Sequence, residues 1–538
     1  MKNLNVVDIK EENKHKQFVN ELVARFDTLK SQRKAVEPVR DEIFKLVCPY
    51  RRREQGEDNR WDTTATSASE RLASLLHNLI TPFGSRWHGL IAPDKKGSFT
   101  DFSENKMIRE GCERLVDDLF AQREVSESGF NLCLKDFYTE VVLFGMGCFY
   151  ITEGKRGGLR YISIPVSSIV CSADHENIID TVFEEFTLKA QDVAKKWGME
   201  ALSDEMKEEL NSSDPKTYEF FQAVFPDKED QYKGYQQVVV CKTENRLMSK
   251  GYYRVMPYII GRYEASPYNL YGYSPTHKAL PSIRRLNALR AAISLHSDRS
   301  LDLPVAVPEK MKGKKLSTKA KAVNLGFMSN TGDLLVRPVV SGDYRPPYEE
   351  INSLQSQVRE TYMLDLFQVF MERASRSAAE SMEKTREKGV FISAIVGGLQ
   401  AEFVGSMVRR EIDVLLHSQG GDRGRLKGVK ISYTSPLYKY QMAESVASDL
   451  LAIRTGSEIA HLLGDPSLMQ AYDGHGLVAK ASRDCGLAER ILLSEEDTKE
   501  KVAGQRQQAE EAQMKQLAME QSIKTGGEIA ELRAKEGM

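Results

Sequence analysis

Six lysines gather in one short stretch of the chain, and their type and spacing define the first chemistry to consider. They are Lys310, Lys312, Lys314, Lys315, Lys319 and Lys321. Ammonium groups at this density attract phosphates and carboxylates. The stretch can therefore contact nucleic acid or an acidic protein surface. A solvated loop without a partner is the alternative, and the sequence leaves both open.

A second polar stretch, Arg373–Lys388, carries charges of both signs. They are Arg373, Arg376, Glu380, Glu383, Lys384, Arg386, Glu387 and Lys388. Spacings of three and four residues favour pairing along the surface of an exposed helix, which needs no ligand. The functional alternative is that some of these side chains contact phosphates.

The sequence carries none of the familiar catalytic motifs. G-x-x-x-x-G-K-[ST], H-E-x-x-H and G-x-S-x-G are all absent. Gly145-Met146-Gly147 ends a predicted helix and enters a predicted strand, which is the reverse of the dinucleotide-binding order, so we interpret it as a structural turn. We predict no catalytic residues and no cofactor, and an enzyme is the weaker class.

The cysteines and histidines do not indicate a metal site. The seven cysteines form no C-x-x-C, and the nine histidines form no pair at ligand spacing. We expect reduced cysteines in the core, and no metal.

Charge and hydropathy limit the possible partners. The chain of 538 residues has 75 basic and 77 acidic side chains, which gives a net charge of −2. A tight DNA binder usually has a basic excess, so any DNA contact here should be weak, local or suited to sliding. The longest dense apolar run, Val141–Ile151, is too short to span a membrane, and no signal peptide precedes it. We expect no membrane partner and synthesis in the cytoplasm.

Two long helices bracket the lysine stretch. Apolar residues recur at helical spacing through Pro281–Asp302 and again through Ile351–Arg373. Both apolar stripes are narrow and both opposite faces are charged, so one chain can bury only part of each helix. Many copies packed around an axis would bury the rest. The pattern favours an assembly with a hole over an active-site cleft.

The flanking regions differ in their patterns. Residues 1–275 begin with helices and continue with short strands from Cys148, which predicts an α+β domain. Within this domain, Tyr252–Arg262 is expected to be one strand. A helix is predicted from Ala378 to His417, and after a Gly/Arg-rich linker the chain is expected to be helical, with separate helices over Leu437–Ile453 and Ser457–Leu463.

In the order of these elements the chain resembles the portal proteins, or head-to-tail connectors, of short-tailed, podovirus-type bacteriophages. The resemblance covers about Phe26 to Thr498. It is carried by the segments Arg71–Trp87, Asp136–Ile151, Tyr271–Pro275, Ser375–Gln400 with Glu402-Phe403, and Ile431–Leu437. No single segment is diagnostic, but their order and spacing together are specific. The chain departs from the usual pattern at Ser377-Ala378, where Thr-Ala is common.

The resemblance implies a mainly α fold with an α+β wing, namely the portal fold of wing, stem, clip and crown. Its parts would be the wing at 1–275, the first stem helix at 276–303, the clip at 304–350, the second stem helix at 351–373, the tunnel loop and inner wing helix at 374–419, and the crown and C-terminal tail at 420–538. In this fold Arg373, Arg376, Glu380 and Lys384 would line the DNA channel. The lysines of residues 310–321 would lie in the clip and dock a partner.

The resemblance also implies a function and a location. The chain would form a homo-oligomeric ring, a dodecamer, at one capsid vertex of the virion, after synthesis in the host cytoplasm. The ring would be the channel for packaging and ejecting double-stranded DNA. Its partners would be the terminase motor, the major capsid and scaffolding proteins, the tail adaptor or tail tube proteins, and possible internal core proteins. The alternatives left open are a monomeric DNA-associated adaptor or scaffold, and a metal-dependent DNA-processing enzyme.

Overall fold

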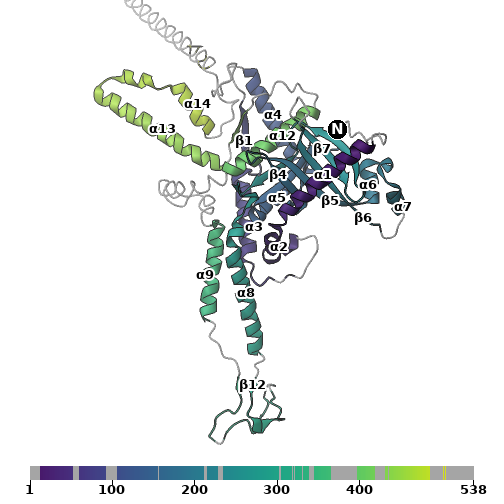
Figure 1. The fold of residues 1–538 in the computed structure, drawn as a ribbon. Coiled ribbons are helices and arrows are strands. Elements are labelled where there is room, and N and C mark those ends of the chain that lie inside the picture. The colour runs from purple at the N-terminus through teal and green to yellow at the C-terminus, as the bar shows by residue number, and fades with distance from the viewer. Residues whose placement is uncertain are drawn as a thin grey trace, which may run out of the picture. The chain divides into compact units, whose positions relative to one another are not determined.

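The computed structural model of the chain describes most of its residues and divides them into two compact units. The described residues are 12–51, 58, 60–91, 106–155, 157–210, 215–227, 234–301, 305–317, 319, 321–329, 331–338, 345–364, 397–418, 430–433, 436–484, 498, 501, 503 and 504. The first unit comprises residues 1–83 and 122–421, and the second comprises 84–121 and 422–538. Figure 1 shows the elements along the chain.

A five-stranded antiparallel sheet lies at the centre of the first unit. Its order is β4-β5-β6-β7-β8, so each strand pairs with its neighbour in sequence. The strands are β4 (Ile169–Ala173), β5 (Ile179–Lys189), β6 (Thr217–Pro226), β7 (Tyr235–Cys241) and β8 (Arg246–Tyr253). The central strand β6 buries side chains on both faces, because helices or other strands cover each of them.

The first helix, α1 (Glu12–Arg33), packs across one face of this sheet. Val19, Leu22 and Phe26 are buried there, and the Phe26 ring stacks on Phe221 at 5.0 Å between centroids. Apolar residues that recur every three or four positions lie on one face of the helix, and that face makes this contact. On another part of the sheet, α6 (Ala190–Trp197) and α7 (Asp204–Glu209) cover a separate apolar cluster that includes Phe220 and Cys241.

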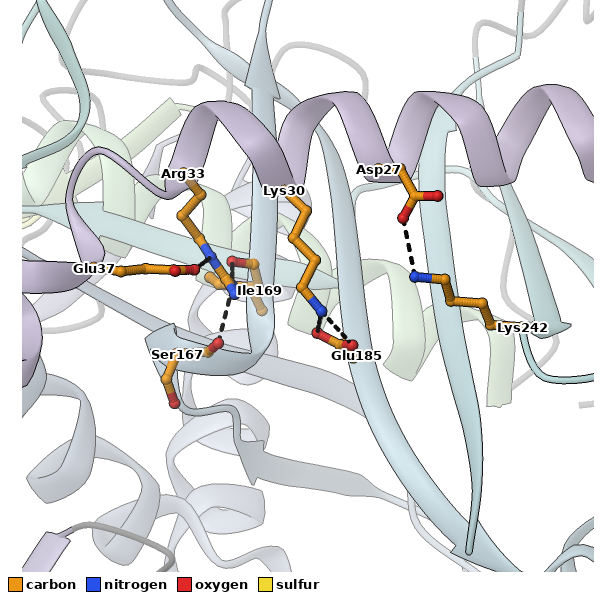
Figure 2. Close-up of polar contacts among 8 residues, drawn as sticks. All are labelled: Asp27, Lys30, Arg33, Glu37, Ser167, Ile169, Glu185 and Lys242. Atoms are coloured by element: carbon orange, nitrogen blue, oxygen red, sulfur yellow. Dashed lines mark hydrogen bonds and ion pairs between the residues drawn. The ribbon is translucent and has the colours of Figure 1, made fainter.

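Polar contacts border the α1 interface (Figure 2). Lys30 Nζ binds both carboxylate oxygens of Glu185 at 2.6 and 2.8 Å, and Lys242 Nζ lies 2.9 Å from Asp27 Oδ1. The buried Arg33 guanidinium donates to the carbonyls of Ser167 and Ile169 at 2.9 and 2.8 Å. These donors and acceptors are nearly all satisfied within the chain, so α1 is fixed in orientation as well as in position.

A three-stranded antiparallel sheet, β3-β2-β9, completes the core of the first unit. Its strands are β2 (Met146–Glu153), β3 (Leu159–Ser163) and β9 (Tyr258–Arg262), and α5 (Phe130–Phe144) packs against β2. Gly147 permits this approach, because a Cβ there would lie 2.6 Å from the Phe137 carbonyl oxygen. Gly145 ends α5 at φ +87°. The glycine pair is therefore a structural turn, as the sequence analysis interprets it.

The remaining elements of the first unit are helices and two short hairpins. The helices are α2 (Glu37–Leu46), α3 (Thr64–Ile80), α8 (Pro275–Leu301), α9 (Arg345–Thr361), a π-helix (Gln400–Val404) and α12 (Gly405–Ser418). The hairpins are β10 (Glu264–Ser266) with β11 (Asn269–Tyr273), and β12 (Val305–Ala306) with β13 (Arg337–Pro338).

The second unit is mainly helical. It contains most of α4 (Lys106–Glu124), α13 (Pro436–Leu463) and α14 (Gly474–Asp484), with β1 (His88–Ile91) pairing antiparallel to β14 (Lys430–Tyr433). Among the helices that the structure describes, none combines the length and apolar character that crossing a membrane requires. The six cysteines in the described ranges are buried and unpaired, as expected.

Several elements differ from the sequence-based expectations. Tyr252–Arg262 is not one strand, because the chain turns between β8 and β9. Strand β6 was not expected from the sequence. Leu437–Ile453 and Ser457–Leu463 are one helix, α13, which continues through Gly456. The Tyr472 ring lies against that glycine, where a Cβ would clash with the Tyr472 hydroxyl oxygen.

The two long helices begin earlier than predicted. Helix α8 starts at Pro275, which leaves Pro281 inside the helix, and α9 starts at Arg345, so Pro346 and Pro347 lie in its first turn. Proline is tolerated at those first positions because the first amides of a helix have no partner within the helix. Helix α9 ends at Thr361, and Met363 has φ +52°. The predicted continuation to Arg373 lies mostly outside the described residues.

Candidate functional site: a helix pair and its lysine-rich tip

Helices α8 and α9, hereafter the helix pair, lie side by side in the first unit (Figure 1). Their buried side chains include Ala279, Leu280, Ile283 and Leu286 of α8 and Ile351 and Val358 of α9. Beyond Leu286, no described side chain of α8 is buried, and Leu295 is more than half exposed. One chain therefore covers only the first part of α8, as the narrow apolar stripe predicts.

Hydroxyl groups attach the start of α8 to the end of α5. Ser274 Oγ donates to the Leu143 carbonyl at 2.9 Å, and Thr276 Oγ1 donates to the Val142 carbonyl at 2.8 Å. The buried Tyr362 hydroxyl, just past the end of α9, lies 2.8 Å from Thr276 Oγ1. The last carbonyls of a helix have no partner within it, so these bonds satisfy α5 while they fix both long helices.

His277 belongs to the same junction. Its Nδ1 lies 2.6 Å from Ser274 Oγ, and burial, together with the nearby Arg40, lowers the pKa of His277 to about 4. The imidazole is therefore neutral near pH 7, and the junction needs no counter-charge at this position.

Asp62 connects three elements at the side of the helix pair. One carboxylate oxygen accepts from the Thr64 amide at the start of α3, at 2.8 Å. The other accepts from Gln355 of α9 at 2.9 Å and lies 3.5 Å from the Arg290 guanidinium of α8. This one mostly buried carboxylate thus holds the helix pair against α3.

More exposed ion pairs complete the attachment. Arg284 of α8 makes a bidentate contact with Glu42 of α2, at 2.7 Å to each oxygen, and Arg285 binds Glu350 of α9 at 2.8 and 3.3 Å. The hydrogen bond from Arg284 lowers the pKa of the Glu42 carboxyl. Solvent screens pairs of this kind, so they orient the helices more than they stabilise them.

Residues 305–338, hereafter the tip, lie between the two helices in sequence. The tip has little core of its own: only Met311 and Phe327 are buried among its described residues. Strands β12 and β13 pair over two residues each, and a second antiparallel bridge joins Met328 to Leu334. All six lysines of the tip are exposed. The tip contains seven basic side chains, the six lysines and Arg337, and two acidic ones, Glu309 and Asp333, so its net charge is +5.

The predicted site residues fall into two groups. The six lysines lie together in the tip, within reach of solvent. Arg373, Arg376, Glu380 and Lys384 lie outside the described residues, as does most of the segment Ser375–Gln400. Their predicted place in a channel remains a prediction.

The chain re-enters the described fold at Gly397 and is anchored soon after. Glu402, in the π-helix, accepts from the Arg262 amide at 3.1 Å and from its guanidinium at 3.0 and 2.5 Å. Phe403 stacks on Phe137 of α5 at 4.4 Å. The π-helix is thus held by the ion pair of Glu402 and by the buried ring of Phe403.

Sequence reasoning missed the residues that attach the helix pair. Ser274-Pro275 is a recognisable helix start, since serine is common before the first turn and proline is common within it. Nothing in the sequence indicates that Asp62 contacts Gln355, which is 293 residues away. Nor does it indicate that Tyr362 contacts Thr276, which is 86 residues away. Those contacts depend on the tertiary fold.

The surfaces of this region indicate what it can do. A partly covered helix pair and an exposed basic tip are features of a protein that acts by binding other macromolecules. Within the ranges that the structure describes, no group of three or more His, Cys, Asp or Glu side chains could hold a metal ion. The partly covered helix pair and the exposed basic tip indicate the class of assembly proteins.

Comparison with protein families specifies that class. The family model described as "Bacteriophage head to tail connecting protein" matches residues 19–492, which is most of the chain. The chain belongs to this family of structural, non-enzymatic phage proteins. The expectation of a phage head-to-tail connector is thereby confirmed, while the short-tailed type remains a prediction.

A solved structure described as "Virion of native gene transfer agent (GTA) particle" is similar over 75% of this chain and 89% of its own, at 12% identity and a TM-score of 0.30. That TM-score is too low to carry an argument. No curated protein matches the chain. The assignment therefore rests on the family match.

Proposed function

We propose that the chain is a phage portal protein, whose copies form a ring at one capsid vertex. The ring is the channel through which the genome is packaged and ejected, and it is the docking platform for the terminase motor and the tail. The observation that carries this proposal is the helix pair. The buried residues of α8 end at Leu286, whereas the helix continues to Leu301. Neighbouring copies around a ring supply the missing contacts, and the resemblance to portals of short-tailed phages implies twelve of them.

The sheet-bearing body, the helix pair, the tip and the C-terminal helices take the roles of wing, stem, clip and crown. Major capsid and scaffolding proteins contact the ring from outside, and internal core proteins contact the C-terminal region. The ring is made in the host cytoplasm and resides in the virion. No ATP-binding motif occurs in the sequence, so the separate motor supplies the energy for packaging.

The channel part of the proposal concerns Arg373, Arg376, Glu380 and Lys384. Ring symmetry would repeat each of these side chains into a circle of charge, so one position can affect the moving duplex strongly. The near-zero net charge of the chain suits a channel in which DNA slides, because many fixed cations would retain the phosphates.

Packaging in capsid precursors tests the proposal directly. Precursors assembled without this chain should fail to package DNA, and precursors assembled with it should package. Replacing Arg376 and Lys384 together with alanine should leave ring assembly intact and change the amount of DNA packaged or retained. Unchanged packaging and retention would remove these two residues from the channel.

Two other functions give different outcomes in solution. A monomeric adaptor or scaffold would show the mass of one chain at every concentration. A metal-dependent DNA-processing enzyme would cut DNA when Mg²⁺ is added, and we expect no such cleavage.

A further inference from the structure

The tip displays two large apolar side chains from a loop that is closed by one asparagine. Asn324 Oδ1 accepts a hydrogen bond from the Ser317 amide, and Asn324 Nδ2 donates to the Ser317 carbonyl, both at 2.8 Å. The side-chain amide thus pairs with a backbone as a neighbouring strand would. Val323 and Leu325, on either side of this fixed residue, are each 82% exposed.

The tip does not use these two side chains for its own packing. Its buried residues are Met311 and Phe327, and the Phe327 carbonyl accepts from the Leu335 amide at 2.9 Å. Gly326 separates Leu325 from Phe327 at φ +83°, a conformation that favours glycine. The backbone therefore turns between a displayed residue and a buried one. Burying a valine and a leucine is worth about 1.5–3 kcal/mol each, and the isolated chain leaves that gain unused.

The charge around the two side chains limits what can cover them. Lys319 and Lys321 lie in the same loop, and the tip as a whole has a net charge of +5. In the proposed ring the neighbouring tips carry the same net charge of +5, so they offer no counter-charge to these lysines. DNA would satisfy the lysines, but it would offer Val323 and Leu325 a charged, hydrated backbone. The complement is a protein surface that is apolar and bordered by carboxylates.

We propose that Val323 and Leu325, held in place by Asn324, insert into an apolar groove of the protein that docks at the tip, while Lys319 and Lys321 pair with carboxylates at the edge of that groove. The inference rests on the docking role given under Proposed function and specifies its partner as acidic and apolar. The two hydrogen bonds hold Asn324 against Ser317 before binding, so less conformational entropy is lost when the partner docks.

The test uses the full-length chain in a phage whose own copy of the gene is disabled. The main variant combines Val323→Ser with Leu325→Ser. The matched control is Leu132→Ser, since Leu132 is also apolar and 70% exposed but lies on α5. Because each tenfold change in affinity corresponds to about 1.4 kcal/mol, the double variant should lower the yield of complete particles roughly tenfold or more. The control should leave the yield unchanged.

Two further variants separate the contribution of the Asn324 hydrogen bonds from that of the two lysines. Asn324→Ala keeps the apolar side chains and removes the bonds that close the loop, so it should reduce the yield by a smaller factor. Lys319→Glu with Lys321→Glu reverses the charge and should reduce the yield as strongly as the double serine variant. Equal yields for the double serine variant and the Leu132→Ser control would overturn the proposal.

A photoreactive benzoylphenylalanine placed at position 323 identifies the partner directly. In assembling particles, cross-links should map to an apolar segment with neighbouring Asp or Glu on a different protein, and Lys319→Glu with Lys321→Glu should abolish them. Cross-links to DNA or to a second copy of the tip would overturn the proposal. If the double serine variant forms normal rings and still docks its partner, this inference alone is contradicted. If the wild-type chain forms no rings, the proposed function is contradicted.

Discussion

The α1 interface and the tip belong to the same compact unit, but they differ in how much of their surface the chain itself satisfies. At the α1 interface, Phe26 stacks on a buried ring and Lys30 and Arg33 find partners in the sheet (Figure 2). Among the described residues of the tip, six large apolar side chains and six lysines remain exposed. The first region is complete in one chain, whereas the second leaves surface exposed that we propose another molecule covers.

This difference separates stability from function. Side chains that are satisfied within the chain determine whether the unit folds, and side chains that are left exposed determine what it binds. Substitutions at the α1 interface should therefore change unfolding, whereas substitutions of exposed residues in the tip should change assembly and leave unfolding alone.

The largest effect is expected from Phe26→Ala. Truncation of a fully buried phenylalanine removes its burial and leaves a cavity, which costs about 3–5 kcal/mol. The midpoint of urea unfolding, followed by circular dichroism, should fall accordingly. Phe327→Ala in the tip is the comparison, and it should leave the main transition where it is. A similar fall in both variants would contradict the distinction between the two regions.

A comparable loss is expected when the buried Arg123–Glu411 pair is broken. The Arg123 guanidinium contacts the Glu411 carboxylate at 3.1 and 2.5 Å, the Tyr161 hydroxyl donates to that carboxylate at 2.5 Å, and Arg123 and Glu411 are both buried. Glu411→Ala leaves Arg123 charged and unpaired, at a cost of roughly 3–5 kcal/mol.

Glu458→Ala is the matched control for Glu411→Ala. It removes an exposed pair with Arg454 on α13, which is worth about 0–1 kcal/mol. Thermal unfolding of the two variants should differ clearly. If Glu411→Ala unfolded like wild type, the buried pair would not hold α12 to the core.

Much of the sheet-bearing part of the first unit could be predicted from its sequence, because the signals for its helices and strands are local. Helix α5 and strands β2 to β5 follow from runs of apolar residues that end at glycine, proline or polar clusters, and these signals act over a few residues. Strand β6 escaped notice because it follows an acidic helical stretch. The partly covered helix pair could be predicted because a narrow apolar stripe is visible in the sequence.

The attachment of the helix pair could not be predicted in the same way. Asp62 meets Gln355, and Thr276 meets Tyr362, only after the fold has brought them together. A single aspartate or tyrosine has no periodicity that marks it. The lysines of the tip were visible as a cluster, but the bonds of Asn324 to Ser317, which display Val323 and Leu325, depend on the backbone conformation.

The buried carboxyl of Glu140, on α5, predicts that the stability of the first unit depends on pH. Burial raises the pKa of Glu140 to about 7, while the Val166 amide, which donates to it at 2.8 Å, opposes that rise. A raised carboxyl pKa favours the protonated folded state, so this stability is present below the unfolded value near 4.5 and is lost as pH rises through 7. The loss amounts to about 3 kcal/mol.

Glu140→Gln keeps an acceptor for the Val166 amide and cannot ionise. Its melting temperature should therefore fall less than that of wild type between pH 5 and pH 8. If the melting temperatures of the variant and of wild type fell by the same amount between pH 5 and pH 8, the pKa of Glu140 would not be raised by burial.

The smallest effect on stability should come from the tip. Val323→Ser with Leu325→Ser changes exposed side chains and should shift the free energy of unfolding by less than about 0.5 kcal/mol. The measurement is the urea midpoint of the same purified protein that is used in the particle assay. A clear loss of stability would mean that these side chains pack within the chain, and the assignment of the tip to docking would then fail.

The central claim is that copies of this chain complete one another around an axis. Negative-stain imaging of the purified full-length protein, paired with its mass in solution, tests that claim most directly. We predict uniform rings with a central hole and a mass near twelve chains, as the resemblance to portals implies. A compact single chain at every concentration, with and without the scaffolding and capsid proteins, would contradict it.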